Sequence, residues 1–132
     1  MSLDAWIVEQ MAEAVVYANR DGTIERWNSG AVAIFGYSAE EALGQNLDLM
    51  IPERLRAAHW RGYNAAMASG SMRLAGRPTL TRGQHKTGQK LYVEMSFSLV
   101  RDDAGQVIGS VAVARDVTER VEREKAAQAP KA

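Results

Sequence analysis

The chain contains no cysteine among its 132 residues. This absence excludes disulfides, thiol nucleophiles, thiolate metal ligands and chromophores that are attached through a cysteine sulfur. The sequence also has no apolar run near the roughly 18 residues that a membrane span needs, and no secretory signal pattern at its start. Because cysteine-free chains fit a reducing compartment, we expect a cytoplasmic protein without a membrane partner.

Neither sign of charge is in excess. Sixteen Lys and Arg residues balance sixteen Asp and Glu residues, so the formal net charge is zero. A domain that binds nucleic acid usually carries a basic face, and this balance therefore disfavours a nucleic-acid partner. Hydrophobic residues make up 46% of the chain, which is ordinary for one globular domain with a core of its own.

Catalytic motifs are also missing. The chain has two histidines, no Gly-x-Ser-x-Gly sequence, no phosphate-binding glycine loop and no His/Asp/Glu cluster at metal-ligand spacing. The adjacent carboxylates Asp102-Asp103 and Glu40-Glu41 fall at a turn and a helix start, where they favour turn formation and the helix dipole. The sequence therefore predicts a non-enzymatic protein without a metal site.

The first half of the chain predicts short helices and one hairpin. A helix begins with Asp4 as its N-cap and carries Trp6 and Ile7 on an apolar face, and Asp21-Gly22 predicts a two-residue hairpin turn. Further helix signals follow: Asn28 as a cap, Ser38 and Glu41 as a capping box, Pro52 as the first residue of the longest helix, and Gly70 as its end.

The second half changes to a period of two. Strands are predicted over residues 77–88, 89–100 and 107–114, followed by a helix from Asp116. Consecutive hairpins imply an antiparallel sheet with helices on one face, an α+β architecture. We divide the chain into an N-terminal amphipathic helix (1–10, whose start is compatible with an expression remnant), a central domain (11–116), and the start of an exit helix with a fraying tail (117–132).

Five stretches together resemble the PAS (Per-Arnt-Sim) sensory family. They are DGTIERWNSGA, IFGYSAEEALGQ, MIPERLRAAH, KTGQKLYVEMSFSLV and GSVAVARDVTER, in this order between about Met11 and Arg120. The resemblance implies a five-stranded antiparallel sheet that cups helices around a small cavity. It also implies a sensor or dimerising module, mostly of bacterial signalling, that precedes output domains such as histidine kinases of two-component systems or cyclases.

A cavity between the long helix and the central strands is the predicted binding site. Its candidate lining residues are Ile34, Leu55, His59, Tyr63, Met95, Phe97 and Ala112. An apolar pocket with a few polar groups is typical of small-molecule sites, whereas the same residues could equally fill a solid core. Arg73, Arg77 and Arg82 either receive a carboxylate at the rim or form a solvated strand face.

Haem is a further candidate cofactor. Oxygen-sensing haem members of the family resemble the segment PERLRAAHWRGY and use a histidine at the place of His59 as the axial iron ligand. They also carry an arginine on the following strand, where this chain has Thr79. The absence of cysteine excludes the flavin-binding members that form a covalent adduct.

The junction between the last strand and the exit helix is predicted to transmit the response. Asp116 and Glu119 have capping-box spacing, and Asp116 with Thr118 resembles the Asp-x-Thr ending of the family. Val117 and Val121, four residues apart, could begin a coiled-coil seam. The alternative is a terminal helix that only caps the sheet edge.

Three functions therefore remain open. The first is a ligand-responsive sensor that acts through the exit helix on an output domain or partner protein. The second is a ligand-free dimerisation or docking module, with a homodimer formed through the N-terminal helix that carries Trp6 and Ile7. The third is a haem gas sensor that uses His59.

Overall fold

The structure is a computed structural model that describes residues 1–72 and 76–128. Arg73 of the proposed carboxylate rim and the last four residues of the predicted fraying tail lie outside the described residues.

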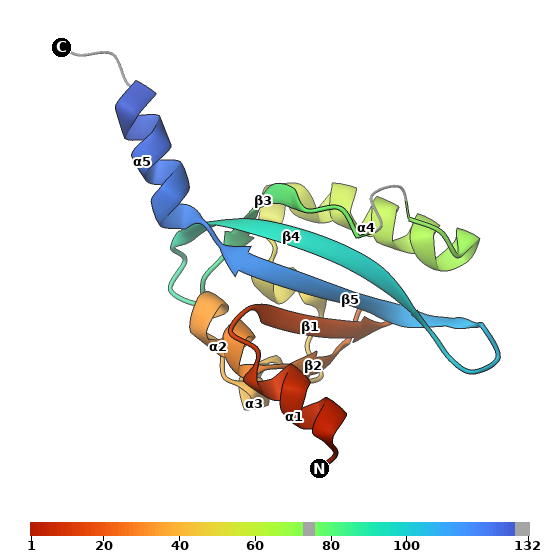
Figure 1. The fold of residues 1–132 in the computed structure, drawn as a ribbon. Coiled ribbons are helices and arrows are strands. Elements are labelled where there is room, and N and C mark those ends of the chain that lie inside the picture. Colours follow the sequence, from red (N-terminus) through yellow and green to blue (C-terminus); the bar gives the residue numbers. More distant parts are fainter. Residues whose placement is uncertain (73–75, 129–132) are drawn as a thin grey trace.

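A five-stranded antiparallel sheet forms the centre of the molecule (Figure 1), as the sequence predicted. Its order is β2-β1-β5-β4-β3, so the first and last thirds of the chain meet at the β1–β5 pair. The strands are β1 (Ala14–Asn19), β2 (Ile24–Trp27), β3 (Thr79–Gln84), β4 (Lys90–Arg101) and β5 (Val107–Asp116). The clean alternation along β4 arises because successive side chains point to opposite faces of the sheet.

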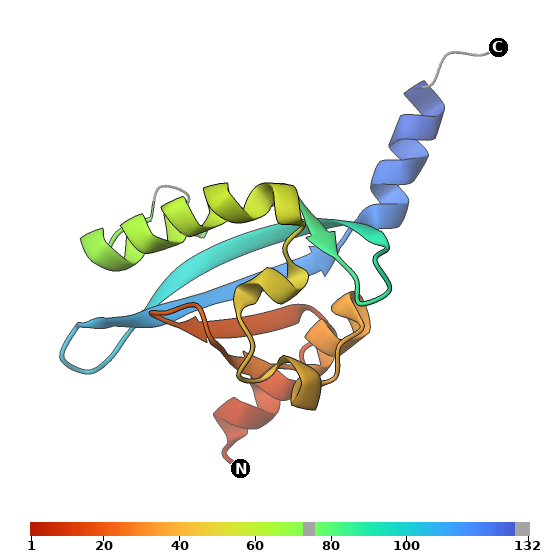
Figure 2. The same cartoon turned by 180° about the vertical axis from the view of Figure 1, so that it is seen from behind.

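Helices gather on one face of this sheet, which Figure 2 shows from behind. They are α2 (Ser29–Phe35), α3 (Ala39–Ala42), the 3-10 helix η1 (Leu47–Met50) and α4 (Glu53–Ser69). α1 (Leu3–Gln10) lies beside α2, and α5 (Thr118–Gln128) projects away from the body of the domain. The helix-on-sheet layering is therefore the α+β architecture expected from the order of the elements.

Side-chain caps begin the short helices where the sequence predicted them. The Asn28 Oδ1 atom accepts a hydrogen bond from the backbone N–H of Ala31, which caps α2. Ser38 and Glu41 form a reciprocal capping box at α3. These contacts confirm that the helix boundaries in this region are encoded locally.

Three predicted boundaries are wrong by a few residues. Ser2, not Asp4, caps α1, because its hydroxyl reaches the N–H of Ala5 while Asp4 already lies in the first turn. Pro52 stands at the N-cap and α4 begins at Glu53, because the backbone of Pro52 is extended. The hairpin loop comprises residues 20–23 rather than two residues, with a bulge in the β1 pairing.

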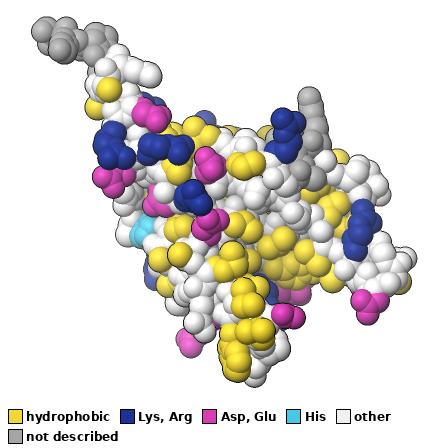
Figure 3. Space-filling model, viewed as in Figure 1, with side chains coloured by type: hydrophobic (Ala, Val, Ile, Leu, Met, Phe, Trp, Pro, Cys, Tyr) yellow, Lys and Arg dark blue, Asp and Glu magenta, His cyan; other side chains and the backbone are white. Residues whose placement is uncertain are grey.

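Apolar residues of α1 remain exposed. Trp6 is 50% exposed and Ile7 is 53% exposed, so the predicted apolar face of this helix does not pack on the domain's own sheet. Figure 3 shows hydrophobic side chains gathered on the molecular surface in the view of Figure 1. No helix within residues 1–72 and 76–128 has the length and hydropathy to cross a membrane.

Candidate ligand-binding site

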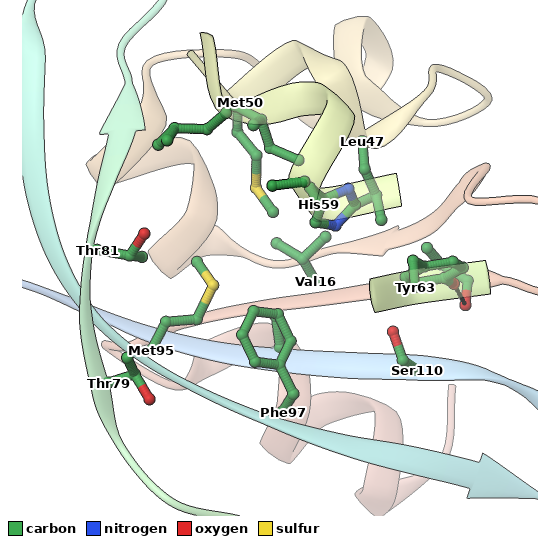
Figure 4. A pocket seen from close by; sticks show the side chains of 15 residues that line it. Val16, Leu47, Met50, His59, Tyr63, Thr79, Thr81, Met95, Phe97 and Ser110 are labelled. Atoms are coloured by element: carbon green, nitrogen blue, oxygen red, sulfur yellow. Dashed lines mark hydrogen bonds between the residues drawn. The ribbon is translucent and has the colours of Figure 1, made fainter. Parts of the chain in front are cut away.

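A cavity of about 360 Å³, which we call the chamber, lies between the sheet and the α4 side of the helical layer (Figure 4). α4 buries only Tyr63, Ala66 and Met67 of its 17 residues, so this helix covers the sheet without filling the space beneath it. The chamber is lined by Val16, Ala18, Leu47, Met50, Ile51, Leu55, Ala58, His59, Tyr63, Thr79, Thr81, Met95, Phe97, Ser110 and Ala112.

The structure brings six of the seven predicted site residues to this wall. They are Leu55, His59, Tyr63, Met95, Phe97 and Ala112. Ile34 is the exception: it packs against the filled hydrophobic core instead. The reason is the position of α2, which lies against β1 at the other end of the sheet face from α4 (Figure 1).

The sequence interpretation missed the hydroxyl-bearing part of the wall. Thr79 and Thr81 face the chamber from β3, and Ser110 faces it from β5. The period-two pattern would have placed Thr79 and Thr81 on one face of their strand. Ser110 pairs with Ala18 and Leu99 in the sheet, a register that only the fold reveals.

His59 contributes an imidazole to the chamber wall. Its ring packs edge-on against Trp60 at a centroid distance of 4.7 Å and lies 5.7 Å from the ring of Tyr63. The Nδ1 atom is buried and has no hydrogen-bond partner within the described part of the chain. Burial lowers the pKa of His59, against the opposing effect of Asp48, and this favours the neutral imidazole.

Tyr63 connects α4 to the end of β1. Its hydroxyl donates to the carbonyl oxygen of Asn19 at 2.5 Å and lies 3.3 Å from that of Ala18. Burial raises the pKa of Tyr63, which keeps the phenol protonated. Tyr63 therefore stabilises the position of the helix above the chamber.

Arg20 and Trp60 add further contacts that fix α4. Arg20 donates to the carbonyl oxygens of Val107 and Met67, at 2.7 and 3.2 Å. The indole N–H of Trp60 donates to the Asp48 carboxylate at 2.8 Å. α4 is thus held by polar contacts along its length, and this allows the space below it to stay open.

Charged side chains are absent from the chamber wall as far as the described residues extend. Arg82 lies on the opposite face of β3, with its guanidinium carbon 4.9 Å from the ring centre of Tyr92, and Arg77 is exposed. The predicted carboxylate rim therefore receives no support from these two arginines. Residues 1–72 and 76–128 also contain no group of three or more His, Cys, Asp or Glu that could hold a metal ion.

A second hollow, which we call the groove, continues from the chamber along α4. It shares Ala58, His59, Tyr63, Phe97 and Ser110 with the chamber wall. Beyond these it is lined by Gly62, Ala65, Ala66, Met67, Ser69, Ser71 and Met72. The two hollows therefore adjoin each other along α4, with these five residues between them.

The junction between β5 and α5 differs from the predicted capping box. Asp116 is the last residue of β5, and its Oδ1 atom accepts hydrogen bonds from the Thr118 N–H at 2.9 Å and the Thr118 hydroxyl at 2.6 Å. Glu119 is exposed in the first turn of α5 and does not take part in these bonds. The motif is an Asx-type turn, which forms because Asp116 lies one residue too early to cap α5.

Tyr92 of β4 completes the junction. Its N–H donates to the Thr118 hydroxyl oxygen at 2.9 Å, and its carbonyl oxygen accepts from the Val117 N–H at 2.9 Å. The centre of its ring also lies 4.5 Å from the ammonium group of Lys125, which is about two helical turns along α5. The start of α5 is therefore bonded to two strands rather than to a free loop.

Val117 and Val121 do not form an exposed seam. Both are buried within the domain, at 6% and 7% exposure. The predicted coiled-coil seam is thus wrong for these two residues, because they are already covered within the domain, where α5 contacts β4. Their burial adds apolar contact to the hydrogen bonds that orient α5.

Comparisons with known proteins agree with this geometry. The family model described as the PAS fold matches residues 8–122. The oxygen sensor protein DosP of Escherichia coli is 28% identical over 122 residues, covering 92% of this chain and 15% of that protein. The sensor protein FixL of Bradyrhizobium diazoefficiens is 23% identical over 91 residues, covering 69% of this chain and 18% of that protein.

A solved structure shows the same fold. The PAS domain of a protein from Colwellia psychrerythraea has a TM-score of 0.77 and 23% identity, covering 89% of this chain and 96% of that chain. The sheet, its helical cover and a family match over nearly the whole length lead to one conclusion: the chain belongs to the PAS family of sensory domains.

Proposed function

We propose that this chain is the sensory module of a larger signalling protein. A small molecule binds in the chamber, and the change reaches an output domain, such as a histidine kinase or a diguanylate cyclase, through α5. The chain spans less than a fifth of the two curated relatives, both of which are named as sensors. A chamber of about 360 Å³ also lies within the range of about 300–1,000 Å³ that small-molecule sites occupy, which favours a ligand over a filled core.

The observation that carries the proposal is that the chamber wall and the junction belong to the same two strands. Met95 faces the chamber and pairs with Ala114, while Val93, two residues earlier, pairs with Asp116. Any displacement of β4 against β5 at Met95 is therefore only two residue pairs away from the Asp116–Thr118 bonds. The short hydrogen bonds at that point pass the displacement to the axis of α5.

The difference in ligand affinity between two arrangements of the domain limits how far the orientation of α5 can shift. A ligand shifts the orientation of α5 only by its difference in affinity for two arrangements of the sheet and helix, typically about 1–3 kcal/mol. The hydrogen bonds of the junction are of comparable size individually, at about 0.5–1.5 kcal/mol each. Such a response is therefore large enough to rearrange the junction without unfolding the domain.

A pair of spin labels tests this proposal. Because the chain has no cysteine, Ser98→Cys on β4 and Glu122→Cys on α5 accept labels selectively, and both sites are exposed. Ala112→Leu adds volume inside the chamber in place of a ligand. We expect it to shift the distance distribution between the two labels in electron double-resonance measurements.

Two variants serve as controls. Val113→Leu adds volume on the opposite face of β5, opposite Ser96 and not opposite the labelled Ser98, and should leave the distribution unchanged. Combining Ala112→Leu with Asp116→Ala should broaden the distribution, because the junction loses its two bonds to Thr118. An unchanged, narrow distribution in Ala112→Leu would refute transmission through α5.

A haem-based gas sensor is the second candidate function. It is supported by His59, whose buried Nδ1 atom has no partner in the described residues, and by the likeness to an oxygen sensor. A neutral imidazole in an apolar cavity suits iron, so these residues fit the group. His59 would hold the iron, and the apolar wall at Leu55 and Phe97 would exclude water from the porphyrin. Haem would supply reversible binding of a diatomic gas.

Reconstitution with haem decides this candidate. We expect a Soret band in the wild type, its loss in His59→Ala, and its retention in His85→Ala, which alters the chain's other histidine. His85 lies at the β3–β4 turn with its ring against Gly36, outside the chamber. A Soret band that survives in His59→Ala, or that never forms, rules out His59 as the ligand.

A further inference from the structure

The composition of the chamber wall restricts the chemistry of what it can bind. Fifteen residues line the chamber, and none of them carries a charged side chain at neutral pH once the imidazole of His59 is neutral. The polar groups are hydroxyls of Thr79, Thr81 and Ser110, the phenol of Tyr63 and the imidazole of His59. Each of these neutral groups can form a hydrogen bond with a ligand, but none of them can act as the counter-ion of a charged ligand group.

The nearby ions are engaged elsewhere. Asp48 accepts the indole N–H of Trp60 and lies 3.9 Å from Arg56, outside the lining. Arg82 lies over Tyr92 on the outer face of the sheet, and Arg20 donates to two backbone carbonyls. An ionic group that entered the chamber would thus lose its water without gaining a described counter-ion, which is costly.

The shape of the hollow adds a second restriction. The chamber and the groove adjoin at His59, Tyr63 and Phe97, and three serines, Ser69, Ser71 and Ser110, lie along the groove. A molecule longer than the chamber can therefore place an apolar part inside and a polar part in the groove. His59 stands where the two hollows meet, so its Nδ1 atom, which has no partner among residues 1–72 and 76–128, is available to a polar group at the boundary.

From this wall chemistry we infer that the part of the ligand inside the chamber is uncharged, mainly apolar and recognised by hydrogen bonds alone. This inference rests on the proposed function, because it names the ligand class of the same chamber. It does not extend to groups of the ligand that remain in the groove or in solvent. A carboxylate or ammonium group is accordingly excluded from the chamber itself.

Three probes that share one apolar skeleton test the inference: 3-phenylpropan-1-ol, 3-phenylpropanoate and 3-phenylpropylamine. Each is titrated into the ¹⁵N-labelled protein, and the amide resonances of His59, Met95 and Ser110 report on the chamber. The resonances of Ile24 and Phe35, in the filled core, serve as the internal control. We expect the alcohol to shift the chamber resonances, with both ions binding at least tenfold more weakly.

The outcomes separate the inference from the proposed function. If the carboxylate or the amine binds as tightly as the alcohol, the inference is wrong while a ligand-binding function stands. Carboxylate binding that disappears in Arg73→Ala would likewise overturn it and assign an anion site to that arginine. If none of the three probes shifts the chamber resonances and dissolved xenon does not shift them either, the chamber is closed in solution. The proposed ligand-binding function then fails together with the inference.

Discussion

The two sides of the helical layer are packed in opposite ways. On the α2 side, Phe35 is completely buried and its ring lies 5.6 Å from that of Trp27. On the α4 side, a chamber of about 360 Å³ separates Phe97 from His59. One sheet thus supports a filled core and an open cavity, which shows that stability and binding are assigned to different parts of the same domain.

The polar groups follow the same division. Asn28 is 1% exposed, accepts hydrogen bonds from the N–H groups of Val15 and Ala31, and donates to the carbonyl oxygens of Val8 and Glu13. His59, in contrast, has a buried ring nitrogen without a partner in the described residues. A satisfied polar group specifies a fold, whereas an unsatisfied one in a cavity is available to a ligand.

Replacing each of the two phenylalanines should give the largest contrast. Phe35→Ala leaves a cavity in the filled core and should lower the free energy of unfolding by about 3–5 kcal/mol. Phe97→Ala enlarges a space that already exists, and we expect a loss of only about 1–2 kcal/mol. Urea denaturation followed by circular dichroism measures both. Equal losses would show that the chamber is filled in solution.

The next contrast concerns two capping asparagines. Asn28→Ala leaves buried N–H and carbonyl groups without partners, and we expect it to cost about 3 kcal/mol. Asn46→Ala removes an exposed cap of η1 and should cost about 1 kcal/mol. The same denaturation experiment compares them. A similar, small cost for both would contradict the structural role of the buried amide.

His59 should make stability depend on pH. Because burial lowers the pKa of the folded-state imidazole below the unfolded value of about 6.5, the unfolded chain binds more protons as the pH falls. Stability contributed by this group is therefore present above pH 6.5 and is lost as the pH drops below it, with a slope of at most about 1.4 kcal/mol per pH unit. His59→Leu should reduce the slope between pH 7.5 and 5.5, measured by urea midpoints. An identical slope in the variant would show that the imidazole is solvated.

The smallest effect is expected at the contact between α5 and the sheet. The hydrogen bond from Lys125, with the positive charges of Lys125 and Arg82 nearby, lowers the pKa of the Tyr92 phenol. Lys125→Ala should raise the pKa of Tyr92 toward its ordinary value and speed amide exchange at the end of α5. Ultraviolet titration of tyrosinate and hydrogen exchange measure these changes. Lys86→Ala, which alters the lysine beside Tyr37, is the matched control and should change neither.

Local sequence patterns predicted the filled side well. The caps at Asn28 and at Ser38 were found because a capping residue acts within four positions of its partner. The α4 boundary at Gly70 was found for the same reason, since that residue adopts a φ of 73° that suits glycine. The boundaries at Asp4 and Pro52 were missed by one or two residues because several neighbouring residues could serve as the cap.

The open side was predicted less completely. Leu55, His59 and Tyr63 follow from the four-residue spacing of one helix face. Ile34 was placed wrongly because helical spacing gives a face but not the neighbour that covers it. Asp116 and Glu119 have the spacing of a capping box, yet Thr118 and Tyr92 compete for the same bonds across the sheet. Tyr92 lies 24 residues before Asp116 in the chain, so a local sequence pattern cannot reveal its bond to Thr118.

The sequence by itself determined the order of helices and strands, the antiparallel sheet, the caps of the short helices and the exclusion of cysteine chemistry. Each of these depends on interactions between residues a few positions apart, or on composition alone. Only the tertiary structure decided that the space below α4 is open, that Ser110 and Thr81 face it, and that Tyr92 holds the start of α5. These features depend on distances between segments far apart in the chain, which the packing of the whole domain sets.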